Sequence, residues 1–204
     1  MLHVGAMLER QRRTIVAHDP GVRIGGDAED VHKLRVAVRR SRAALRIGRP
    51  LLDQAVTEPL RDDLKWLAGE LGAVRDLDVL LEHLADQLGE LPEEDRFAAE
   101  RVVQVLSAER DVARTRLVEA LESERYLDLL DRAAHVAAEP PASGREKSLG
   151  ALAARQFDRL RKSVNELPAD PTDEDLHRVR IKAKGRATRR SSCGRRSESR
   201  LPAS

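Results

Sequence analysis

Residues 31–46, VHKLRVAVRRSRAALR, combine one histidine with six cationic side chains and contain no carboxylate. On a helix, at about 100° per residue, five of these side chains fall within an arc of roughly 80°. Guanidinium groups this close repel one another unless an anion lies among them, and the planar fork of Arg matches adjacent phosphate oxygens. A row about 20 Å long fits an extended polyanion better than a single phosphate. The five residues are His32, Arg35, Arg39, Arg42 and Arg46.

The same pattern recurs near the end of the chain. EDVHKLRV at 29–36 returns as EDLHRVRI at 174–181, and GAMLERQ at 5–11 returns as GALAARQ at 150–156, so both pairs are 145 residues apart. A constant offset across an intervening loop indicates a duplicated helical unit. We expect a pseudo-two-fold arrangement in which the two copies face each other. The second copy repeats the first three cationic positions as His177, Arg180 and Lys184.

Basic side chains at helical spacing on other segments are expected to extend this surface. Those at 155–162 form an i, i+4, i+7 row, and the first of them has a repeat equivalent near the N-terminus. Two more lie close together in angle if residues 60–75 are helical. These added candidate residues for polyanion binding are Arg155, Arg159, Lys162, Arg10, Lys65 and Arg75.

Helices are expected to position these side chains, because Ala, Leu, Arg and Glu dominate the 204 residues and aromatic residues make up only 2%. Pro and Gly interrupt a heptad-like apolar spacing along the chain. We expect one all-α domain, a helical bundle with internal pseudo-two-fold duplication. Helices are predicted at 2–18, 28–50, 57–71, 75–89, 93–123, 125–138, 146–166 and 173–186.

Composition narrows the possible functions. Residues 185–204 hold six Arg and one Glu and contribute about +5, so the net charge of +2 leaves about −3 for the remainder. This balance, and the scarcity of aromatic stacking platforms, disfavour nucleic-acid binding. The single cysteine excludes an internal disulfide framework. No apolar run is long enough for a signal peptide or a membrane span, which favours a cytoplasmic protein with no membrane partner.

Other interpretations of the charged residues remain open. The cationic face could be a solvated surface paired with carboxylates such as Asp62, Asp63, Asp76 and Asp78. Metal-dependent phosphohydrolysis could use Asp76, Asp78 and His83, although carboxylates at i, i+2 point to different sides of a helix. The chain could also be a purely structural helical scaffold. Our prediction is a binding protein that is not an enzyme, with no catalytic residues, no cofactor and no metal site.

Three stretches together resemble a known family, the CHAD domain or conserved histidine α-helical domain. They are HKLRVAVRRSRAALR at 32–46, LKWLAGELGAVRDLDVLLEHL at 64–84 and LHRVRIKAK at 176–184. The resemblance implies two four-helix halves and binding of inorganic polyphosphate along a basic central groove. It also allows an accessory role to a triphosphatase domain. It places the family's histidines on His32 and His177, and its basic motif positions on Arg35, Arg39, Arg180 and Lys184; Lys65 and Arg75 lie within the second stretch.

The chain departs from the family pattern after Lys184. Where the family continues with further helices, residues 185–204 are rich in Arg, Ser and Gly without apolar periodicity. We expect a domain at 1–184 with a truncated second half, and a disordered tail at 185–204 for which a frameshift is our hypothesis. Apolar surface left exposed by the truncation predicts self-association. The expected partner is polyphosphate, and the expected location is the cytoplasm, including polyphosphate granules.

Overall fold

The described residues form helices joined by short connections. A computed structural model of the chain describes residues 2–25, 27–89, 91–143, 149–168, 170–181 and 183. Within these ranges no strand occurs beyond an isolated bridge between Leu52 and Ala142, so the predicted all-α class is confirmed. The helices are α1 (Leu2–Ile24), α2 (Ala28–Gly48), α3 (Gln54–Leu88), α4 (Glu93–Glu122), α5 (Glu124–Ala138) and α6 (Leu149–Asn165), with a further helical segment at 173–181.

The helices were compared with the length and hydropathy that a membrane span requires. None of the described helices has a stretch that is both long enough and apolar enough to cross a bilayer. The predicted domain boundary at Lys184 and the tail at 185–204 lie outside the described residues.

Helix α1 is longer than predicted. The expected end near residue 18, based on Asp19-Pro20-Gly21, is wrong, because the helix continues to Ile24. Val22 is only 2% exposed, so core packing holds the last turn despite the missing amide hydrogen of Pro20. The helix ends at Gly25, whose φ of 79° favours glycine and whose N–H donates to the Gly21 carbonyl at 3.0 Å.

Helix α3 unites two segments predicted as separate helices, 57–71 and 75–89. Leu67, Leu71 and Val74 are all fully buried, so one apolar stripe crosses the predicted break. The helix begins after Asp53, whose side chain accepts a hydrogen bond from the Ala55 N–H at 2.9 Å. Continuous packing therefore outweighs the local signal for a turn.

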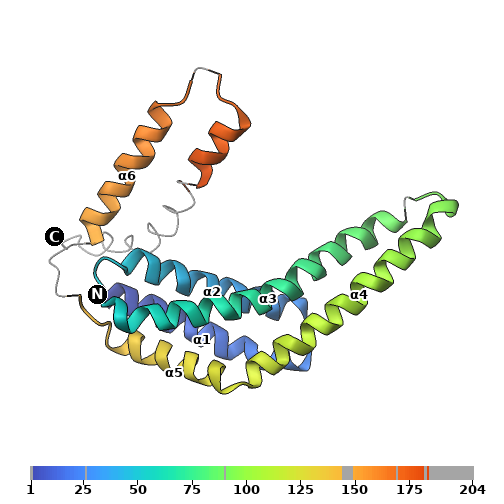
Figure 1. Cartoon of the computed structure of the whole chain (residues 1–204), viewed down its shortest axis with the longest axis horizontal. Coiled ribbons are helices and arrows are strands. Elements are labelled where there is room, and N and C mark those ends of the chain that lie inside the picture. Colours follow the sequence, from blue (N-terminus) through green and yellow to red (C-terminus); the bar gives the residue numbers. More distant parts are fainter. Residues whose placement is uncertain are drawn as a thin grey trace, which may run out of the picture.

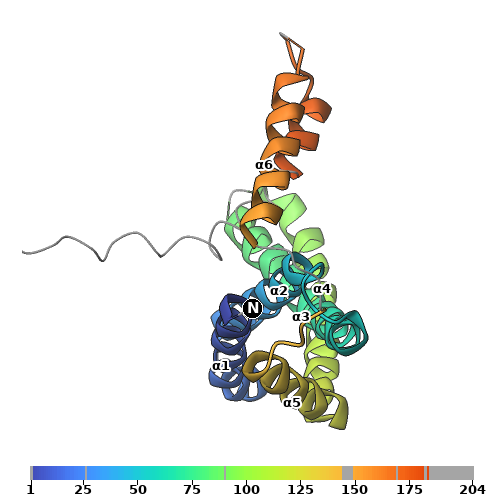
Figure 2. The same cartoon turned by 90° about the vertical axis from the view of Figure 1, so that its left-hand side faces the viewer.

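The first five helices form one body with a shared aliphatic core (Figure 1). Helix α1 packs on α2 and α5, and α2 also packs on α3. Beyond this core α3 and α4 continue as a paired arm. Helix α6 and the 173–181 segment rise from the body as a separate hairpin, on the side where α2 lies, and Figure 2 shows the same relation from a second direction. Core residues include Leu34, Leu60, Leu67, Leu121 and Tyr126.

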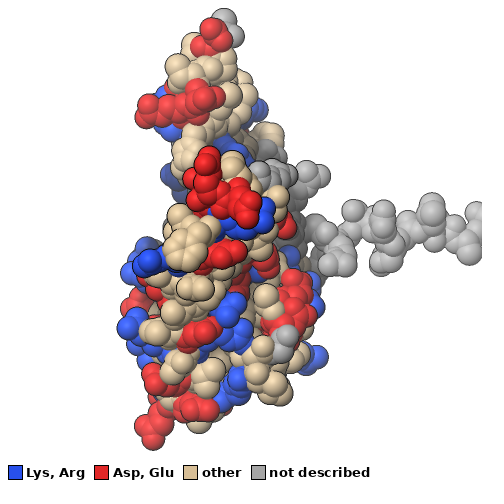
Figure 3. All heavy atoms as spheres, turned by 90° about the vertical axis from the view of Figure 1, so that its right-hand side faces the viewer, with Lys and Arg blue, Asp and Glu red and all other residues tan. Residues whose placement is uncertain are grey.

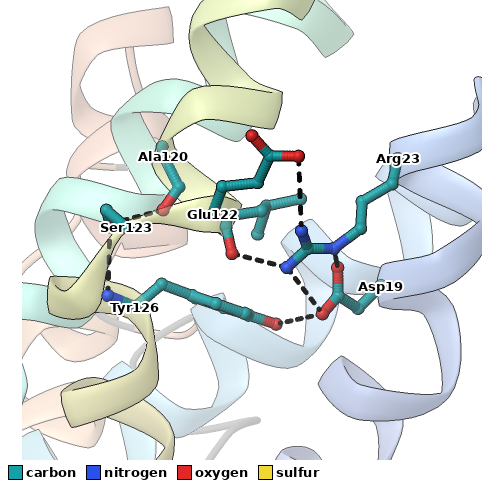
Figure 4. Close-up of polar contacts among 7 residues, drawn as sticks. Asp19, Arg23, Ala120, Glu122, Ser123 and Tyr126 are labelled. Atoms are coloured by element: carbon teal, nitrogen blue, oxygen red, sulfur yellow. Dashed lines mark hydrogen bonds and ion pairs between the residues drawn. The ribbon is translucent and has the colours of Figure 1, made fainter.

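The junction of α4 and α5 is tied to the end of α1 (Figure 4). Ser123 separates the two helices, and its Oγ accepts a hydrogen bond from the Tyr126 N–H at 3.3 Å. The Tyr126 hydroxyl donates to Asp19 Oδ2 at 3.2 Å, while Arg23 bonds both Asp19 and the Leu121 carbonyl. Burial, reinforced by Asp19, raises the pKa of the Tyr126 hydroxyl. The neutral phenol therefore acts as the donor that joins α5 to α1.

A buried carboxylate links α3 to α5. The Asp63 side chain is 11% exposed and accepts hydrogen bonds from Arg125 Nε at 2.9 Å and Arg132 Nη1 at 2.6 Å. The Arg125 guanidinium also lies 4.3 Å from the centroid of the Trp66 ring, a cation–π contact. Both carboxylate oxygens of Asp63 are therefore satisfied by charged donors.

Replacing Asp63 by Ala should lower the free energy of unfolding by about 1 to 3 kcal/mol, because two guanidinium groups lose their shared acceptor. The loss stays within this range since both arginines are part-exposed and can be rehydrated. Urea unfolding followed by circular dichroism measures the change. Asp62→Ala is the matched control, because its exposed carboxylate lies on the same turn. Equal losses in the two variants would contradict the structural role of Asp63.

Candidate functional site

Helix α2 separates its apolar side chains from its cationic ones, as the sequence predicts. Asp27 caps the helix by accepting a hydrogen bond from the Glu29 N–H at 2.8 Å. Leu34, Val38 and Leu45 are buried, and the helix packs on α1 and α3. Of the five predicted cationic residues, Arg39, Arg42 and Arg46 are exposed, whereas His32 and Arg35 are half-buried.

Arg35 is already engaged by a carboxylate of α3. Its Nη1 donates to Asp76 Oδ1 at 2.7 Å, and the Asp76 side chain is 71% exposed. By contrast, Arg39, Arg42 and Arg46 form no side-chain hydrogen bond or ion pair with the rest of the described chain. Exposed ion pairs contribute at most about 1 kcal/mol, so an incoming polyanion could displace Asp76 from Arg35.

The pairing of α2 with α3 places Lys65 beside the free arginines. The two helices are antiparallel, because a short connection joins them and they pack against each other. Arg46 lies eleven residues after Arg35, and Lys65 lies eleven residues before Asp76. Since Arg35 contacts Asp76, Arg46 and Lys65 stand at the same level of the two helices. We call the exposed residues Arg39, Arg42, Arg46 and Lys65 the cationic row.

Two glycines leave the α3 side of the cationic row open. A Cβ added at Gly69 or Gly72 would meet no atom within 4 Å. By the same register, Gly72 stands level with Arg39 and Gly69 with Arg42. The guanidinium groups therefore lie beside an unobstructed stretch of helix. The sequence alone missed this opening, and only the α2–α3 register could have indicated it.

The other predicted basic residues are not gathered at the cationic row. Helix α6 is not among the helices that pack on α2, so the predicted apposition of the two repeat copies stays a prediction. The Arg75 side chain is only 19% exposed, and its Nη1 lies 3.5 Å from Glu82 Oε1. Lys162 Nζ lies 3.7 Å from Glu166 Oε1. Exposed elsewhere are Arg10 on α1, Arg155 and Arg159 on α6, and His177 and Arg180 on 173–181, while Lys184 is outside the described residues.

The acidic residues proposed for metal-dependent hydrolysis are divided between two environments. Asp78 is 7% exposed, and its Oδ2 has no hydrogen-bond partner among the described atoms. Burial raises the pKa of its carboxyl, while Arg110, Arg114 and Arg75 act in the opposite direction. Asp76 is exposed, so the two carboxylates lie on different sides of α3, as their spacing predicts. Across the described ranges no three His, Cys, Asp or Glu side chains gather as a metal site.

Charge segregation is not seen at the end of the molecule where the α3–α4 arm projects. Figure 3 looks onto the end of the molecule where the α3–α4 arm projects, and basic side chains are intermixed there with acidic ones. On α4, Arg110 Nη2 pairs with Asp111 Oδ1 at 2.9 Å. Residues 31–48 of α2, which contain no carboxylate, therefore contrast with the surface of the arm.

Together the fold and the cationic row define an all-helical protein with an arginine-rich, unpaired face on one helix. The family model for the CHAD domain matches residues 6–186, and the chain belongs to this family. The resemblance noted from the three sequence stretches is therefore confirmed.

Two solved structures are similar to this chain. "PptA from Streptomyces chartreusis" aligns with a TM-score of 0.73 and 24% identity over 93% of this chain and 74% of that one. The CHAD domain from the plant Ricinus communis aligns with a TM-score of 0.63 and 28% identity over 93% of this chain and 64% of that one. The chain thus spans less than two thirds of the plant structure. None of the curated proteins matches it.

Replacing Asp78 by Asn should raise the free energy of unfolding at pH 7, on the order of 1 kcal/mol, because a buried oxygen no longer has to be charged without a partner. The raised pKa means that the folded state holds this proton more tightly than the unfolded state. Stability therefore falls as pH rises from the ordinary value of 3.8 through the folded pKa, and Asn removes that fall.

Urea unfolding between about pH 3 and pH 7 measures both effects of the Asp78 replacement. Asp86→Asn removes an exposed carboxylate from the same helix and controls for net charge. A loss of stability in the Asp78 variant at pH 7 would show instead that the ionised carboxylate is paired with the nearby arginines.

Proposed function

We propose that the chain binds inorganic polyphosphate at the cationic row and has no enzymatic activity of its own. The observation that carries this proposal is the group of three exposed guanidiniums, Arg39, Arg42 and Arg46, without an acidic partner among the described side chains. Membership of the CHAD domain family supports it, because that family is linked to polyphosphate binding. In this proposal the protein acts in the cytoplasm, where it is targeted to polyphosphate granules.

The geometry of the row suits a linear chain of phosphates. Arg39 and Arg46 are separated by about 10 Å along the helix axis, so one polyanion segment can reach all three arginines. Each guanidinium can donate two parallel hydrogen bonds to neighbouring oxygens, and Lys65 adds a point charge on the α3 side. His32, half-buried near the start of the helix, offers a further N–H donor.

The hairpin supplies a second group of basic residues in this proposal. Arg155 and Arg159 are exposed on α6, and His177 and Arg180 are exposed on 173–181. A polyphosphate longer than the cationic row could contact them after binding at α2. Their contribution should then depend on ligand length, whereas that of the row should not.

Replacing Arg39, Arg42 and Arg46 together by Ala should lower polyphosphate affinity about tenfold or more and flatten its dependence on salt, because fewer counterions are exchanged. Fluorescence titration with labelled polyphosphate at several salt concentrations measures both quantities. Circular dichroism confirms that helicity is kept, as expected for exposed side chains.

The matched control for this triple variant replaces Arg96, Arg101 and Arg116 by Ala, since these exposed residues of α4 carry the same total charge. It should change affinity only slightly. Equal weakening by the two triple variants would mean that net charge alone attracts the polyanion, and the proposed site would be wrong.

Replacing Asp76 by Asn should raise polyphosphate affinity about two- to fivefold, because Arg35 loses a carboxylate that competes with the ligand. The Arg35–Asp76 distance of 2.7 Å makes this competition direct. Asp86→Asn removes the same charge farther along α3 and should leave affinity nearly unchanged. The same fluorescence titration measures both affinities. An equally large increase in affinity for Asp86→Asn would show that net charge, and not the Arg35–Asp76 pair, causes the effect.

A further inference from the structure

The hairpin of α6 and 173–181 has an apolar face that the described residues leave partly uncovered. Val164 on α6 and Leu176 on 173–181 are each 47% exposed. Leu160 lies one turn before Val164 on α6, Leu167 lies in the turn that follows α6, and Val179 lies one turn after Leu176; these three are half-buried. The two helices therefore cover each other only in part.

The internal repeat allows the hairpin to be compared, residue by residue, with α1 and α2 of the first body. Helix α2 begins after the capping residue Asp27, and the 173–181 segment begins after Thr172, 145 residues later. The Thr172 hydroxyl accepts a hydrogen bond from the Asp175 N–H at 3.3 Å, so both residues act as caps. The equivalent helices therefore start at equivalent residues.

At this offset the hairpin's apolar residues correspond to core residues of the first body. In the first body the four positions are at most 2% exposed, because α3 and α5 cover the α1–α2 pair. In the hairpin the same positions are half-buried or exposed. The pairs are Ile15 with Leu160, Val22 with Leu167, Val31 with Leu176, and Leu34 with Val179.

Charge favours one kind of covering surface. Helix α6 holds four basic side chains and one acidic one, whereas residues 170–181 hold four acidic and two basic ones. When two such hairpins meet face to face about a two-fold axis parallel to the helices, α6 of each lies against 173–181 of the other. Opposite charges then border the apolar seam on both sides.

We propose that two copies of the chain associate through this hairpin face and form an antiparallel four-helix bundle between them. The bundle covers each α6 and 173–181 pair with a second helix pair, as α3 and α5 cover α1 and α2 in the first body. The association does not depend on polyphosphate.

The face is small, so the association should be weak. A helix of 17 residues is about 25 Å long, and two neighbouring helices span about 20 Å, which gives on the order of 500 Å² per chain. Interfaces of this size lie at the lower end of specific ones, and a dissociation constant in the micromolar range is expected.

Sedimentation equilibrium of the full chain, from about 1 to 200 μM, should show a closed monomer–dimer equilibrium. The double variant Leu160→Glu with Leu176→Glu should raise the dissociation constant at least about tenfold, because four charges would enter the seam. Val105→Glu, at a 60% exposed site on α4, should leave the constant unchanged. A monomer at every concentration, or an open-ended series of oligomers, would overturn the proposal.

Hydrogen exchange of the unaltered chain gives a readout that does not depend on how the variants fold. Amides of residues 149–181 should exchange more slowly as protein concentration rises, while those of α4 should not change. Concentration-dependent protection on α4 instead would overturn the proposal, because that helix exposes its own apolar residues, including Phe97 and Val105. Dimerisation without any added anion separates this inference from the proposed polyphosphate function.

Discussion

Burial of one side of α2 is the constraint on which the candidate site depends. The helix packs on α1 and α3, and residues such as Leu34 and Val38 are fully enclosed. Rotating α2 to hide its arginines would expose that aliphatic surface, at a cost of about 1.5 to 3 kcal/mol for each large side chain. The apolar pattern therefore fixes the outward direction of Arg39, Arg42 and Arg46 without any specific contact to their guanidinium groups. The same packing sets the register that brings Lys65 level with Arg46.

Electrostatics explains why this face differs from the rest of the surface. Many other arginines of the body have an acidic neighbour, as in the pairs that hold Asp63 between α3 and α5. Among the arginines of α2, only Arg35 has such a partner within the described part of the chain, and Asp76 reaches it from another helix. The remaining guanidiniums repel one another at low ionic strength, so the folded state contains a small electrostatic cost. A bound polyanion would convert that cost into attraction, which is a physical reason for the proposed ligand class.

The sequence predicted the all-helical class and the two sides of α2 better than it predicted where helices end and which side chains of different helices meet. Period-3.6 patterning placed the cationic and apolar sides of α2 correctly because both depend on residues within one helix. The break at Pro20 was wrong because Val22 is buried in the shared core, and local signals do not include tertiary packing. The engagement of Arg35 by Asp76 and the burial of Arg75 also follow from the way α3 packs on its neighbours. Projecting the residues of a single helix onto a circle could predict neither the Arg35–Asp76 contact nor the burial of Arg75.

The separation of the basic residues into two groups affects how a polyanion would be held. Helix α6 does not pack on α2, so its arginines and the cationic row are joined by the chain connection between the first body and the hairpin rather than by a shared rigid core. When a ligand is already bound at one group, its binding to the second group is an intramolecular step. The gain in affinity then depends on the effective concentration of the ligand at that second group. A short polyphosphate would occupy the α2 face alone, whereas a long one could engage both groups. In the proposed function, preference for long chains then arises from the spacing of two modest sites, without a preformed pore.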